Sequence, residues 1–195
     1  MLLVLPDWQG RRMNAVAAQA VSATAAYLRE ILSQYADGKD DDLDYRVARR
    51  NAHDADATLS KSLSQLMQEP HWARRNVLWG QRILVLSHSL LNYVSALGAH
   101  RGKLEGAEQD ALLLSTGAMA VKEFNAVATA LRAHGQFDSN LPDAATCESA
   151  AKALEEHAES AAEPLRVLLN QLALICRQIA PLRHVAGELA RVAKK

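Results

Sequence analysis

The sequence predicts an all-α protein built as an antiparallel bundle of about six helices. Of the 195 residues, 49% are hydrophobic but only 5% are aromatic, so Ala and Leu supply most of the apolar side chains. That composition suits close helix–helix packing better than a β-sheet. Apolar residues recur every three or four positions over long stretches, and no stretch alternates in the manner of a strand. Short loops between long helices favour antiparallel neighbours.

The periodic stretches and their breaks define the expected helices. We expect them over residues 11–35, 42–68, 71–100, 107–133, 143–160 and 163–180. Gly38 can cap the end of the first helix. Pro70 cannot continue the second helix but fits the first turn of the third. Pro181 should kink or break the last helix, so residues 182–193 form either a separate short helix or a bent continuation.

One apolar stripe on each long helix gives the expected core. The stripes consist of Met13, Val16, Ala17, Ala20, Thr24, Tyr27, Leu28, Ile31 and Tyr35; Trp72, Trp79, Ile83, Leu86, Leu90, Tyr93 and Leu97; Leu113, Ala120, Phe124, Val127 and Leu131; and Leu165, Leu168, Leu169, Leu172, Ile175, Cys176 and Ile179.

Charge and cysteine usage exclude several classes of protein. The 22 basic and 22 acidic residues balance, whereas nucleic-acid binding normally needs a basic excess. Cys147 and Cys176 form no C-x-x-C motif, which favours buried free thiols in a reducing compartment. The sequence contains no run of 18 consecutive apolar residues, so we expect no segment to span a membrane. The apolar start lacks the basic region of a signal peptide.

The N-terminal ten residues have two interpretations. Apolar residues 1–5 are followed by Trp8 and then by Arg11 and Arg12. An aromatic residue followed by basic ones is typical of the cytoplasmic flank of a transmembrane helix. A hydrophobic first strand or arm explains the same pattern.

Four basic residues share one face of the second helix, at spacings of three, four and seven. They are Arg46, Arg49, Arg50 and His53. Arginine forks on one face can bind a carboxylate, a phosphate or a lipid headgroup. The alternative is a solvated face or an internal salt-bridge network, which is the commoner arrangement in helical bundles. Acids that can pair with these residues are Asp42, Asp54, Asp56 and Glu123.

A second polar stripe lies on the third helix. It consists of Gln81, His88, Asn92 and Ser95. We expect His88 to be buried with a hydrogen-bond partner, because Asn92 at the next turn is a poor zinc ligand. Near His53 there are only Asp54 and Asp56. No serine lies in a G-x-S-x-G elbow. We therefore expect no metal, no cofactor and no catalytic activity, and we place His88 and Asn92 in a polar network or anion site.

Two segments resemble a known family. They are YRVARRNAHDADATLSKSLSQLMQEP, over residues 45–70, and RILVLSHSLLNYVSALGAHR, over residues 82–101. Both resemble the C-terminal region of the YccS/YhfK-type inner-membrane proteins, in the fusaric-acid-resistance (FUSC) group of aromatic-acid exporters. The opening LVLPDWQ resembles the junction after the last membrane helix of that family. Residues 105–195 match only in helical character, and the family supplies no catalytic residues to carry over.

The resemblance implies a soluble cytoplasmic domain of a multi-pass inner-membrane transporter. Residues 1–10 would be the junction after a transmembrane helix, and residues 11–195 a single helical domain. Its role would be assembly, gating or regulation, and its partner the membrane portion of the same polypeptide. A homo-oligomer and an anionic small molecule are further candidate partners. The alternative is a stand-alone soluble helical protein that binds an anion or acts as an enzyme.

Overall fold

The computed structural model describes residues 8–37, 42–68, 77–99, 107–133, 144–163 and 165–192. The regular structure in these ranges is entirely α-helical. The helices are α1 (Trp8–Asp37), α2 (Asp42–Met67), α3 (Val77–Ala99), α4 (Ala107–Arg132), α5 (Ala144–Ser160) and α6 (Leu165–Val192). The predicted all-α bundle is therefore confirmed.

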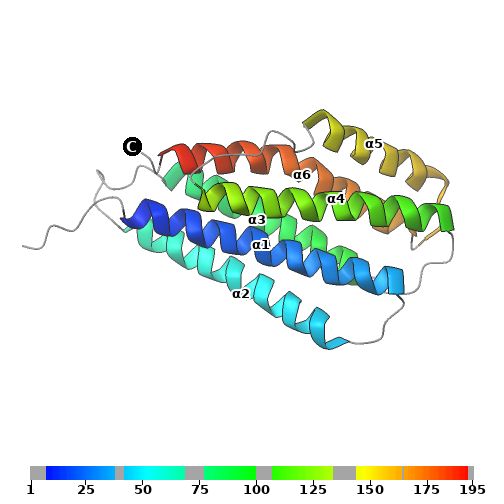
Figure 1. Cartoon of the computed structure of the whole chain (residues 1–195), viewed down its shortest axis with the longest axis horizontal. Coiled ribbons are helices and arrows are strands. Elements are labelled where there is room, and N and C mark those ends of the chain that lie inside the picture. The colour runs from blue at the N-terminus through cyan, green and yellow to red at the C-terminus, as the bar shows by residue number, and fades with distance from the viewer. Residues whose placement is uncertain are drawn as a thin grey trace, which may run out of the picture.

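Four of the helices form the centre of the bundle. α1 packs against α3 and α4, and α6 packs against the same two helices from the other side. α2 covers α1 and α3, whereas α5 lies on α6 (Figure 1). Successive helices run in opposite directions along the long axis (Figure 1). Within the described ranges α3 and α4 do not touch although they are consecutive, because α1 is the neighbour of α4.

The observed helix ends differ from the expected ones at the start of the chain. α1 begins at Trp8, three residues before the expected start of the first helix at residue 11. Residues 1–7, Gly38, Pro70 and residues 71–76 lie outside the described residues, as do residues 134–143.

α6 runs through Pro181 without a break. The helix is continuous from Leu165 to Val192, which excludes a separate short helix after the proline. Proline removes the hydrogen bond to the carbonyl of the residue four positions earlier, here Arg177. Both Arg177 and Pro181 are exposed, so water can satisfy that carbonyl.

The predicted core faces are confirmed for most of their described residues. Nearly every predicted residue of α1, α4 and α6 is buried, including Phe124 and Leu172 with no exposed surface. The exceptions are half-buried and pack against the edge of the core. They are Val16, Trp79, Leu86, Tyr93 and Leu165. Trp72 lies outside the described residues.

Tyrosine hydroxyls hold α1, α2 and α3 together near one end of the bundle. The hydroxyls of Tyr27 and Tyr45 lie 3.0 Å apart, and Tyr35 donates to the carbonyl of Leu97 over 2.7 Å. Burial, helped by the bond to Tyr45, raises the pKa of Tyr27 above its usual range. A Cβ added at Gly98 would lie 3.0 Å from the Tyr45 hydroxyl, so any larger residue there would push against this contact.

Both cysteines are free and buried, as expected from their spacing. Cys147 lies on α5 and Cys176 on α6, the two helices that pack together. Burial and the neighbouring Cys147 raise the pKa of the Cys176 thiol to about 12. Cys176 is thus a protonated, unreactive core residue at neutral pH.

Candidate functional site

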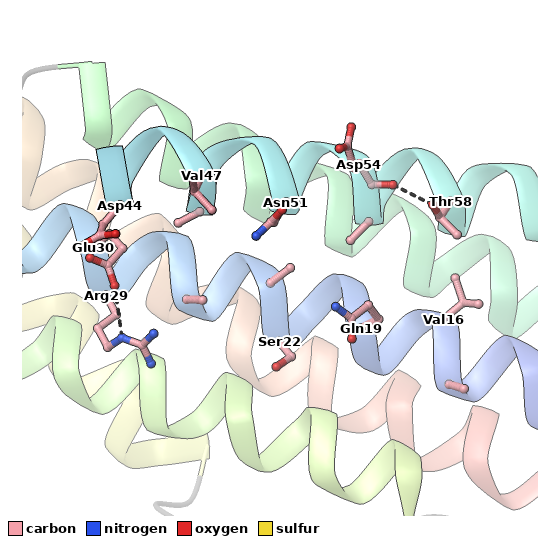
Figure 2. A pocket seen from close by; sticks show the side chains of 15 residues that line it. Val16, Gln19, Ser22, Arg29, Glu30, Asp44, Val47, Asn51, Asp54 and Thr58 are labelled. Atoms are coloured by element: carbon pink, nitrogen blue, oxygen red, sulfur yellow. Dashed lines mark hydrogen bonds and ion pairs between the residues drawn. The ribbon is translucent and has the colours of Figure 1, made fainter. Parts of the chain in front are cut away.

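A groove of about 840 Å³ runs along the outer surface between α1 and α2 (Figure 2). Small side chains leave the space open, because helices that meet at alanines present no bulky group to fill the gap between them. The apolar lining consists of Ala15, Val16, Ala23, Ala26, Val47, Ala48 and Ala55. The volume falls within the range typical of small-molecule sites.

Polar and charged side chains form the rest of the groove. The polar residues are Gln19, Ser22, Asn51 and Thr58, and the charged residues are Arg29, Glu30, Asp44 and Asp54. Arg29 Nε lies 3.6 Å from Glu30 Oε1 on the same helix (Figure 2). The lining thus holds three carboxylates and one guanidinium, and one of the carboxylates, Asp54, also lies 3.6 Å from Arg50 outside the groove.

The predicted basic face lies outside this groove. Arg46, Arg49, Arg50 and His53 are all exposed, and none of them lines the groove. On the helical wheel they lie on the side of α2 opposite Asn51, which does line it. Arg50 Nε is 3.6 Å from Asp54 Oδ2, one turn further along α2, and both side chains are highly exposed. This geometry is a solvated face with at least one helix-surface pair, and not a buried network.

Glu123 does not approach the basic face, contrary to one of our expectations. It lies on α4, which makes no contact with α2 among the described residues. Its Oε2 instead accepts from Nη1 of Arg183 on α6, over 3.4 Å. Glu123 is fully buried, and its Oε1 has no hydrogen-bond partner. Burial raises the pKa of this carboxyl, and the charges of Arg183 and Lys122 oppose that rise.

The polar stripe of α3 meets α2 through His88. His88 Nδ1 lies 3.0 Å from Asp56 Oδ2, so the pair joins the two helices. The expectation of a buried histidine is wrong: the His88 side chain is 62% exposed, and Asp56 is the buried partner at 13%. Asn92 and Gln81 are also exposed. The residue types alone indicated a partner for His88, but the pairing of α2 with α3 was needed to identify Asp56.

No metal site emerges from these residues. In the part of the chain that the structure describes, no three His, Cys, Asp or Glu side chains lie close enough together to hold a metal ion. Asp56, which sequence spacing placed near His53, faces His88 instead.

Comparison with known proteins identifies relatives of about half the chain. An uncharacterized protein of Haemophilus influenzae is 44% identical over 110 residues, or 56% of this chain. The inner membrane protein YccS of Escherichia coli is 41% identical over 105 residues, or 54% of this chain. About half of this chain is homologous to a segment of an inner-membrane protein. A Neisseria gonorrhoeae protein designated ORF2 is 34% identical over 94 residues.

The matched region is a small part of each relative. It covers 15% of the Haemophilus protein, 15% of YccS and 22% of the Neisseria protein. No protein-family model matches the chain, and no solved structure matches it significantly. None of the described helices is both long and apolar enough to cross a bilayer. The chain is thus related to a segment of a much longer inner-membrane protein.

Proposed function

We propose that this chain is the cytoplasmic module of a multi-pass inner-membrane transporter of the FUSC type, with a role in assembly, gating or regulation. The observation that carries the proposal is the 41% identity to YccS over 105 residues, a match that takes up 15% of that inner membrane protein. A segment of that size in a longer membrane polypeptide is expected to act on the rest of it.

The N-terminal residues support a location on the cytoplasmic face of the membrane. Five apolar residues and Pro6 precede α1 in the sequence, and Arg11 and Arg12 follow in its first turn. Basic residues close to a membrane segment favour the cytoplasm. Trp8, at the start of α1, suits the level of the lipid headgroups.

The polar pairs support a role without catalysis. The His88–Asp56 pair has the residue types of an acid–base pair, but neither residue lines the α1–α2 groove. The lining of that groove holds three carboxylates and one guanidinium, which is a poor match for the aromatic acids that exporters of this type would carry. We therefore assign substrate translocation to the membrane portion, and control of that portion to this bundle.

The test is efflux by the full-length polypeptide with and without this domain. Export of aromatic carboxylates is measured in cells, and the amount of polypeptide in the membrane fraction is measured in parallel. We expect both forms in the membrane and reduced export by the truncated one. Equal export by both forms would contradict the proposal. Full-length polypeptide in the soluble fraction would favour a stand-alone anion-binding protein or enzyme.

A further inference from the structure

The outward face of the first half of α3 carries the most exposed large apolar side chains in the described ranges. Leu78 is 71% exposed and Val85 is 64% exposed. The two residues lie seven positions apart, so they project from the same face of α3 two turns apart. Because both side chains contact water, the fold does not gain the free energy that their burial would supply.

A hollow of about 390 Å³ lies between these two side chains. Four of its lining residues are Leu78, Gln81, Arg82 and Val85, and Val185 of α6 and the half-buried Leu86 complete it. Positions i, i+3, i+4 and i+7 of one helix are the four that form a hole for a side chain of a facing helix in knobs-into-holes packing. The geometry of the hollow therefore fits a helix as its occupant.

Arg82 adds a positive charge to the lining of this hollow. It is the one charged residue among those that line the hollow. Its guanidinium carbon lies 4.7 Å from the centre of the Trp79 ring, so a cation–π contact holds it beside the opening. The Trp79 ring in turn meets the ring of His184 edge-on, with centroids 5.9 Å apart. A positioned guanidinium favours a carboxylate on the occupant.

We propose that this face of α3 docks a helix from the membrane-bearing remainder of the same polypeptide. That helix places an apolar side chain in the hole and an Asp or Glu, one turn away, against Arg82. The inference rests on the proposed function, since the relatives are several times longer than the matched region. A second copy packed about a twofold axis through the hollow would bring Arg82 against Arg82 and so supplies no carboxylate partner. A bilayer surface fits poorly too, because the apolar side chains flank a hollow.

Photocrosslinking in membranes tests the proposal. Benzoylphenylalanine replaces Val85 in the full-length polypeptide, and Leu43 in a matched control. Leu43 is also exposed and apolar, at 58%, but lies on α2 and does not line the α1–α2 groove. We expect position 85 to give an adduct with a helical peptide of the same polypeptide outside residues 1–195, and position 43 to give none. An adduct with a lipid, with a second copy or with another protein, or no adduct at position 85, would overturn the proposal.

Charge reversal adds an independent measurement. Arg82→Glu should lower the yield of the adduct at position 85 about tenfold, as expected when a buried charge pair is lost. Replacement of the crosslinked acid by Arg, in combination with Arg82→Glu, should restore it. The isolated chain carrying Arg82→Glu should melt as the wild type does, since Arg82 is exposed. An unchanged adduct yield would exclude Arg82 from the contact.

The two proposals can fail separately. If the full-length polypeptide is found in the soluble fraction, the proposed function fails. If it is in the membrane and exports substrate but position 85 gives no intramolecular adduct, only the docking inference fails.

Discussion

Individual charged residues in this bundle differ chiefly in whether water reaches them. Glu123 has no exposed surface, and among the described residues it pairs with Arg183, whose side chain is 22% exposed. The charged form of a buried carboxylate loses its hydration, and a single contact of 3.4 Å compensates only in part. The arginines of α2 are exposed and keep their hydration, so substituting them should change the free energy of unfolding much less.

Glu123 should make the stability of the fold depend on pH. Burial raises its pKa above the ordinary value of 4.5, so the folded state binds the proton more readily than the unfolded state. Its contribution to stability is therefore full below that ordinary value and is lost as pH rises through the raised pKa. Glu123→Gln should remove this loss, so the unfolding free energy of the variant should increase relative to that of the wild type as pH rises. Urea unfolding over a pH series measures the difference.

The control for this titration is Glu148→Gln. Glu148 is exposed and pairs with Arg177 over 3.5 Å at the surface. Its substitution removes one carboxylate from the surface, so it controls for the loss of a negative charge without any change in the core. Parallel stability curves for wild type and Glu123→Gln would show that Glu123 has the same pKa in both states.

Arg49 and Arg183 should respond differently to alanine. Arg49 is exposed on α2, so Arg49→Ala should cost less than about 1 kcal/mol of unfolding free energy. Arg183→Ala leaves the buried Glu123 without its partner and should cost about 3–5 kcal/mol. Chemical denaturation at neutral pH measures both. A large loss for Arg49→Ala would mean that the basic face is part of a structural network.

At the scale of a helix, α3 shows how one apolar stripe divides between core and surface. Leu90 is fully buried, whereas Leu86, one turn earlier on the same stripe, is half-buried beside the exposed Leu78 and Val85. α3 packs against α1, α2 and α6, and near its start Gly80 lies against Leu63 and Met13, while Leu78 and Val85 on the outward side stay exposed. Leu86, which the apolar stripe assigned to the core, therefore lies at the edge of the core.

Replacing Leu86 and Leu90 with alanine, one at a time, should lower the free energy of unfolding by different amounts. Leu90→Ala should cost about 2–5 kcal/mol, because it removes buried methyl groups and leaves a cavity. Leu86→Ala should cost less, because part of its side chain already contacts water and water can fill the space it vacates. Urea unfolding of the two variants measures the difference. Equal losses would show that the hollow beside Leu86 is closed in solution.

At the scale of the whole molecule, the outer helices have fewer neighbours than the central four. α5 packs on α6 and only marginally on α4, whereas α1 packs against α2, α3 and α4. Local opening needs less free energy where a helix can detach without disturbing several partners. α5 lies at the outside of the bundle, mainly against α6 (Figure 1), so its detachment would disturb few other helices.

Hydrogen exchange should report this hierarchy. Amides of α5 should exchange fastest among the described helices, and those in the middle of α1 and α4 slowest. Peptide-level mass spectrometry under native conditions measures the order. Protection of α5 equal to that of α1 would mean that the bundle opens only as a single unit.

The sequence by itself determined the helices and their buried faces. A repeat of three and four places apolar side chains on one side of a helix, whatever the helix packs against, so residues such as Tyr27, Phe124 and Leu172 were identified as core before any fold was known. The same local reasoning located α2, α4 and α5 to within about two residues, but left open whether the helix continues past Pro181.

Only the tertiary structure decided which helices are neighbours, and every contact between distant residues depends on that choice. Glu123 was a candidate partner for the α2 arginines, but α4 lies beside α6 and α1, so its partner is Arg183. The α1–α2 groove and the hole on α3 are likewise spaces between or beside packed elements. The periodicity of the sequence specifies on which face of its own helix a side chain lies. The partner that it meets is set by the packing of the whole bundle, to which all helices contribute together.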